Sequence, residues 1–128
     1  MKYFLFLLLL FTACADNSAN NKQLAPTALD AGRGYLEACL QGDFSKATGY
    51  ITGDSLLQKN LRTQEADYRT LEREGRQTRR TASIQIHAIN EVSSDKVLMI
   101  YSFSYAPEIK DTLHIQQQAA GWMLVAKF

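Results

Sequence analysis

Residues 82–128 read ASIQIHAINEVSSDKVLMIYSFSYAPEIKDTLHIQQQAAGWMLVAKF. Apolar and polar side chains alternate along much of this segment, which is the period-2 pattern of half-buried β-strands. Short segments that are polar or contain Gly or Pro divide it into four predicted strands, at residues 82–89, 96–105, 109–117 and 122–128. The segment therefore predicts an antiparallel meander with one buried face.

The pairing of these strands follows from the side on which their apolar residues lie, because cross-strand partners point to the same face of a sheet. When each strand is joined to the next by a short loop, the apolar residues of the two strands lie opposite one another in all three hairpins. The predicted pairs are Ile86 with Tyr101, Met99 with Ile115, Tyr101 with Leu113, and Ile115 with Leu124. Agreement among three separate hairpins supports the sheet more strongly than any single strand does.

Helices are predicted before the sheet. Thr27 is placed to cap a first helix, which Gly42 ends. Asp43 can cap a short second helix. The stretch Thr52-Gly53-Asp54-Ser55 then breaks the chain and caps a longer third helix that continues to about Arg80. Helices followed by an antiparallel meander indicate the α+β class, with the N-terminal helices packed on one side of the sheet.

The N-terminus has the layout of an export signal. Lys2 precedes an unbroken apolar run over residues 3–11, and small residues follow directly before Cys14. The run is too short to cross a hydrocarbon core, which needs about 20 helical residues. Phe11-Thr12-Ala13-Cys14 resembles the bacterial lipobox, in which the cysteine is acylated and the segment before it is removed. Residues 1–13 are thus predicted to be a lipoprotein signal peptide, with an ordinary signal peptide as the alternative.

Residues 14–25 are predicted to be the lipidated cysteine and a flexible tether, because they are too polar to bury a core. Acyl chains on Cys14 would hold the protein at a membrane. In enterobacterial lipoproteins an Asp directly after the cysteine favours the inner membrane, so by this resemblance Ala15 points to the outer membrane. The expected location is the cell envelope, and residues 26–128 form the single predicted domain.

Composition limits the possible functions. The chain has 128 residues, 46% of them apolar, and 14 basic against 13 acidic side chains. This size excludes a multidomain enzyme, and the near-zero charge removes the electrostatic basis for non-specific nucleic-acid binding. With Cys14 lipidated, Cys39 has no partner for a disulfide within the chain, and it is expected to be a buried, unreactive thiol.

Two short segments carry a resemblance to a known family. They are YLEACLQGDFSKA at residues 35–47 and Gly-Trp-Met-Leu at residues 121–124. They resemble the cone-shaped superfamily of nuclear transport factor 2, ketosteroid isomerase and scytalone dehydratase, and within it small bacterial lipoproteins of unknown function described as lumazine-binding-like. The resemblance implies a curved sheet that encloses a pocket together with the helices. It leaves the function open, because this superfamily includes both enzymes and binding proteins.

An enzyme of this fold places a carboxylate or a histidine inside the pocket as a general base. His87 and His114 fall on the face opposite the apolar set, so neither is expected to enter the pocket. Asp111 has inward parity, opposite Phe103, but is expected to be solvated at the end of the sheet. The sequence contains no motif for a metal, a phosphate loop or a catalytic triad, so no catalytic residue, metal or cofactor is predicted.

Aromatic residues are the feature best suited to hold a ligand, since aromatic walls with hydroxyl tips can stack on a planar molecule and hydrogen-bond to it. The same residues can equally be core beneath the helices, and both interpretations remain open. The candidate pocket residues are Tyr35, Tyr50, Tyr101, Phe103, Tyr105 and Trp122.

Two surface features could contact binding partners. Arginines crowd the end of the third helix at Arg73, Arg76, Arg79 and Arg80, where they can be a solvated helix end or a contact for anionic headgroups and cell-wall polymers. The outer sheet face could bury apolar area in a homodimer, as superfamily members often do. Its apolar residues are Leu98, Ile100, Met123 and Val125.

The predicted function is a membrane-anchored envelope lipoprotein with a non-enzymatic domain that binds a small apolar molecule or an envelope protein. The alternative is an isomerase, dehydratase or hydrolase that acts on a small apolar substrate in the same pocket.

Overall fold

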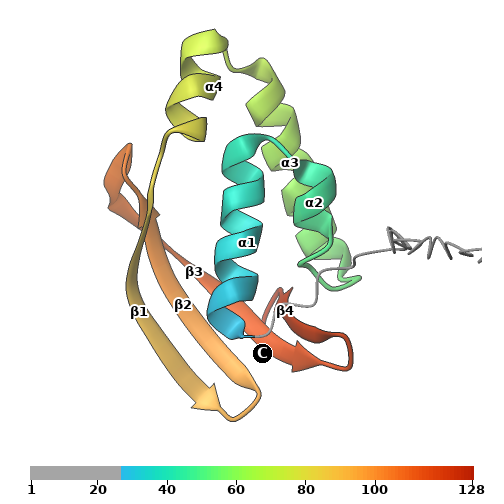
Figure 1. Ribbon diagram of the computed structural model, residues 1–128. Helices are drawn as coiled ribbons and strands as arrows, with labels where there is room; N and C mark the ends of the chain where they lie inside the picture. Colours follow the sequence, from blue (N-terminus) through green and yellow to red (C-terminus); the bar gives the residue numbers. More distant parts are fainter. Residues whose placement is uncertain (1–26) are drawn as a thin grey trace, which may run out of the picture.

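The computed structural model describes residues 27–128, and the predicted signal peptide, Cys14 and the tether lie outside the described residues. Helices precede strands along the chain, as the sequence predicts (Figure 1). The elements are α1 (Ala28–Gln41), α2 (Phe44–Thr48), α3 (Ser55–Thr70), α4 (Arg73–Arg80), β1 (Ile84–Ser93), β2 (Lys96–Phe103), β3 (Ala106–Gln118) and β4 (Gly121–Val125). None of the described helices is long and apolar enough to cross a membrane.

The helix starts follow the predicted caps. The Thr27 hydroxyl accepts a hydrogen bond from the Asp30 N–H at 3.1 Å, which satisfies a backbone donor in the first turn of α1. Gly42 ends α1 in the left-handed region at φ 76°, a conformation that glycine adopts without a steric penalty. The side chains of Asp43 and Asp54 accept from the N–H groups of Lys46 and Leu56 at 3.0 and 2.8 Å.

The prediction of one long third helix is wrong, because the chain breaks at Leu71. This residue has the extended angles φ −66° and ψ 137°, and its N–H donates to Tyr68 O at 3.1 Å. An unbroken helix from Ser55 to Arg80 would span about 39 Å and carry its end away from the sheet. The break instead lets α4 turn back, where the Gln41 side chain donates to Arg80 O at 3.1 Å.

The four strands form one antiparallel sheet in the order β1-β2-β3-β4, which confirms the predicted meander. The β3–β4 register is also confirmed, with Ile115 opposite Leu124. In the first hairpin Ile86 lies opposite Tyr101 as expected. A bulge at His87 then shifts the rest of β1 by one position.

The predicted β2–β3 register is wrong by two residues, since Met99 lies opposite Leu113 and not Ile115. Strand β3 begins at Ala106, directly after a tight turn. Between the pairs Tyr101–Asp111 and Phe103–Ala106, β3 has more residues than β2, and the irregularity there accommodates them. This irregular stretch includes Pro107, which has no N–H to donate to a ladder. A shift of two residues leaves every side chain on its predicted face, so the alternation pattern does not distinguish the two registers.

The helices lie on one side of the curved sheet, and α1 contacts all four strands (Figure 1). Gly32 allows this approach, because a Cβ there would lie 2.5 Å from Met99 Cε. The buried apolar residues, apart from Leu40, form one cluster that extends from Ala28 to Leu124. Because this cluster is continuous and lies within residues 27–128, that segment contains the core it needs to fold as an independent domain.

Within residues 27–128, no helix lies over the other sheet face (Figure 1). Its apolar residues, those predicted for a homodimer contact, are each half-buried. The homodimer itself stays a prediction.

Candidate functional site

A cavity of about 120 Å³ lies between the helices and the sheet. All four helices and strand β2 contribute to its lining. The lining residues are Leu36, Cys39, Leu40, Phe44, Gln64, Asp67, Tyr68, Arg79, Tyr101 and Phe103.

Two aromatic pairs form much of the wall. On the sheet side, Tyr101 and Phe103 meet edge to face with ring centroids 5.4 Å apart. On the helix side, Phe44 and Tyr68 meet in the same way at 5.7 Å. Edge-to-face contact stabilises the relative position of two rings beyond what the burial of their apolar area contributes. The cavity therefore has rigid aromatic surfaces from both layers of the domain.

Neutral polar groups interrupt this aromatic wall. Tyr35 OH accepts a hydrogen bond from Gln64 Nε2 at 3.4 Å and is also hydrogen-bonded to the Cys39 thiol. Burial raises the pKa of Cys39 to about 11. Burial likewise raises the pKa of Tyr35 and Tyr101, and the nearby Asp111 charge raises the pKa of Tyr101 further. These hydroxyl and thiol groups thus keep their protons at neutral pH and can donate hydrogen bonds.

The fold of the domain is similar to that of a solved structure. A crystal structure at 1.70 Å resolution of an NTF-2-like protein of unknown function from Shewanella oneidensis MR-1 aligns with a TM-score of 0.53, covering 75% of this chain and 89% of that chain at 12% sequence identity. The chain has the NTF-2-like fold. No protein-family model and no curated protein matches the sequence. The finer likeness to lumazine-binding-like lipoproteins stays a prediction.

The NTF-2-like cone places the six candidate pocket residues at different depths. Tyr101 and Phe103 line the cavity, and Tyr105 stacks on Phe103 with centroids 5.5 Å apart. Tyr105 is 36% exposed, and the Arg79 guanidinium lies 4.7 Å from its ring centroid. Tyr35 is buried and joins the cavity through Gln64.

The remaining two candidates lie away from the cavity lining. Tyr50 is buried against Gly34 of α1, and its backbone O accepts from Leu124 N at 2.8 Å. Trp122 is half-buried and packs against the apolar core. Tyr50 therefore joins α1 to β4, whereas Trp122 packs on the core from β4 itself.

Sequence reasoning missed the contribution of α3 to the site. Asp67 and Tyr68 lie three and four residues after Gln64, so the three side chains are on one side of the helix, and all line the cavity. This spacing is a signal that the sequence contains. It marks a shared face but does not say whether that face meets a cavity or solvent.

The acid–base candidates lie outside the cavity. His87 Nε2 lies 2.7 Å from Ser102 Oγ on the outer face, and the His114 ring packs edge to face on Phe128 at 5.0 Å. Asp111 is exposed and lies opposite Tyr101, not opposite Phe103 as the predicted register had it. Within residues 27–128 no three side chains of the metal-ligating types come together.

Raised pKa values in the cavity predict a loss of stability at alkaline pH. The unfolded chain releases the Cys39 proton near pH 9, whereas the folded domain holds it to about pH 11. Unfolding therefore releases protons in this window, and the free energy of unfolding falls by up to about 1 kcal/mol per pH unit as pH rises. Urea unfolding of residues 26–128 at pH 8, 9 and 10 measures this slope.

Cys39→Ser is the matched variant for this measurement, because it keeps the size of the side chain and removes the thiol. Its stability is expected to change less between pH 9 and 10, since the tyrosines of the unfolded chain, with a pKa of 10.0, are at most half ionised in this window. Parallel pH profiles of the two proteins would contradict the assignment to Cys39.

Proposed function

We propose that this protein is a cell-envelope lipoprotein, anchored through Cys14, whose NTF-2-like domain binds a compact single-ring molecule in the cavity between α1, α3 and β2. The observation that carries the binding role is the aromatic cavity with neutral hydrogen-bond donors in its wall. The lipobox-like segment supports the anchor, and Ala15 supports the outer membrane as its place.

The size of the cavity limits the ligand. Pockets for drug-sized ligands occupy about 300–1,000 Å³, whereas an engineered apolar cavity of about 150 Å³ takes up benzene. A cavity of about 120 Å³ therefore suits one ring. The Gln64 amide and the Cys39 thiol can hydrogen-bond a single polar substituent on that ring, so a phenol-like molecule fits this chemistry.

Binding has more support than the alternative of catalysis. A general base for isomerase or dehydratase chemistry must reach the substrate, and its pKa must be tuned by a desolvated site. Asp67 is the carboxylate that lines the cavity, and it is exposed to solvent. Because both histidines lie on the outer sheet face, the described residues favour a binding role.

Phenol is the probe for this proposal. We expect phenol to bind the domain of residues 26–128 with a Kd on the order of 1 mM or below. In a titration followed by ¹⁵N NMR, the shifted amides should cluster at Leu36, Cys39, Tyr101 and Phe103. Cys39→Leu should weaken binding by more than about tenfold, because the longer side chain fills the cavity.

Cys39→Ser provides the control at the same position, since it leaves the volume of the cavity nearly unchanged. It should bind phenol within about threefold of the parent domain. Thermal melting of both variants establishes that they remain folded. Equal affinity of the Leu and Ser variants, or shifts spread away from the cavity, would refute the proposed binding site.

A further inference from the structure

A second, larger hollow lies beside the cavity and shares Phe44 and Tyr68 with its wall. It has a volume of about 600 Å³ and lies between α3, α4 and the junction of α1 with α2. We name it the arginine groove after four of its lining residues, Arg69, Arg73, Arg76 and Arg80. The function proposed above makes no use of this groove.

The break at Leu71 assembles the groove. Arg73, Arg76 and Arg80 are spaced three and four residues apart, so they lie on one face of α4. Tyr68 OH accepts a hydrogen bond from Arg80 Nε at 3.1 Å, which positions that guanidinium and leaves its Nη groups for another acceptor. The turn of the chain thus directs one arginine face of α4 toward the end of α3.

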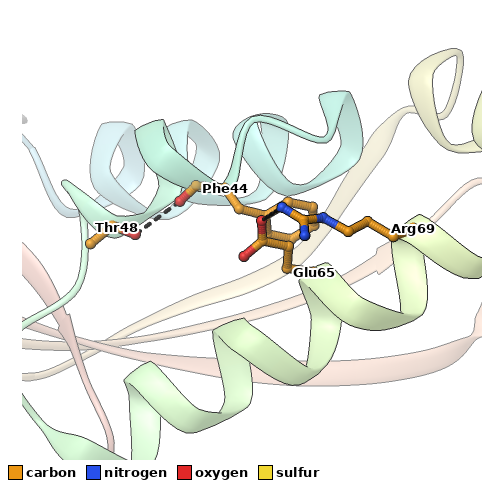
Figure 2. Close-up of polar contacts among 4 residues, drawn as sticks. All are labelled: Phe44, Thr48, Glu65 and Arg69. Atoms are coloured by element: carbon orange, nitrogen blue, oxygen red, sulfur yellow. Dashed lines mark hydrogen bonds and ion pairs between the residues drawn. The ribbon is translucent and has the colours of Figure 1, made fainter.

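One carboxylate lines the groove, and it is already paired. Glu65 Oε1 lies 2.6 Å from Arg69 Nη2, and Figure 2 shows this pair reaching from α3 toward Phe44 of α2. Glu65 therefore offsets the charge of one arginine among the four that line the groove. The other three guanidinium groups leave it with a formal charge of +3.

This charge is concentrated locally. Residues 27–128 contain 12 basic and 12 acidic side chains, so the domain as a whole is formally neutral. Positive side chains near a helix C-terminus are favoured by the helix dipole, which accounts for Arg80. Arg73 is the first residue of α4, where the dipole disfavours a cation. The arrangement is therefore better suited to an external anion than to capping the helix.

We propose that the arginine groove binds a ligand that carries two neighbouring phosphate groups. The planar guanidinium forks of Arg73, Arg76 and Arg80 match the geometry of phosphate oxygens. A phosphate pair would also relieve the repulsion among these three like charges on one helix face. The volume of the groove exceeds what a single phosphate would fill.

Two probes distinguish a soluble phosphate from a lipid headgroup. Calorimetry measures binding of inorganic pyrophosphate to the domain of residues 26–128. Co-sedimentation measures its binding to phosphatidylcholine vesicles with and without cardiolipin, whose headgroup carries two phosphates. The test variant is Arg73→Gln with Arg76→Gln, because glutamine keeps helix propensity and removes charge. The matched control is Lys59→Gln with Lys110→Gln, which removes two exposed charges elsewhere.

We expect the arginine variant to bind at least about tenfold more weakly and the lysine control to stay within about twofold. Arginine-dependent binding of pyrophosphate supports a soluble ligand, and arginine-dependent binding to the anionic vesicles alone supports a headgroup. Absence of binding in both assays overturns the proposal. Equal weakening by the two double variants also overturns it, because attraction would then come from overall charge and not from the groove.

Discussion

Replacement of Leu124 by alanine is expected to lower the free energy of unfolding by about 3–5 kcal/mol, as large-to-small changes in well-packed cores do. Leu124 is 2% exposed and lies opposite Ile115. Its backbone also bonds to the segment after α2, with Thr52 N donating to Leu124 O at 3.0 Å. Since small domains are stable by about 5–15 kcal/mol, this loss removes a large share of the total.

Leu56→Ala is the matched control, because it makes the same chemical change at a residue that is 55% exposed. Thermal melting of residues 26–128 should show a fall of more than about 10 °C for Leu124→Ala and only a few degrees for Leu56→Ala. Similar melting temperatures for the two variants would contradict the placement of β4 in the core.

Replacement of Cys14 by serine is expected to abolish membrane retention of the full chain. Serine has no thiol to acylate, and each buried methylene of the lost acyl chains contributes about 0.8 kcal/mol to membrane binding. Expression in a bacterium with a labelled fatty-acid analogue, followed by membrane fractionation, measures both acylation and retention. The variant should carry no label and should accumulate as the uncleaved precursor.

Cys39→Ser in the full chain is the control, because it removes the other cysteine and leaves the lipobox-like segment intact. That variant should be labelled and should fractionate with membranes like the parent protein. If the Cys14 variant were retained to the same extent without any label, the proposed lipid anchor would be excluded.

Part of the candidate site could be predicted from the sequence. Tyr101 and Phe103 were identified because strand alternation places them on the buried face, and they do line the cavity. The residues from α3 were not identified, since their helical spacing says nothing about what the helix faces. The arginines were seen as a cluster near the end of a helix, but the groove that they line depends on the break at Leu71.

Features that rest on neighbouring residues could be predicted from the sequence. Thr27, Asp43 and Asp54 set the starts of three helices because each side chain accepts from backbone donors two or three positions ahead. Gly42 set the end of α1 because its left-handed conformation suits glycine. Strand alternation fixed the buried face of β2, β3 and β4, and a short loop fixed the β3–β4 pairing, whereas the bulge at His87 changes the alternation in β1.

Features that depend on distant contacts could not be predicted from local sequence patterns and became visible in the folded domain. The observed β2–β3 register differs from the predicted one by two residues. This difference leaves each side chain on the same face of the sheet, so the alternation pattern could not distinguish the two registers. The break at Leu71 gives up helical hydrogen bonds, and the contact of Gln41 with Arg80 O offsets part of that loss. The arginine groove follows from that turn, which places Arg80 beside Tyr68, and the same turn brings Arg79 to the lining of the cavity.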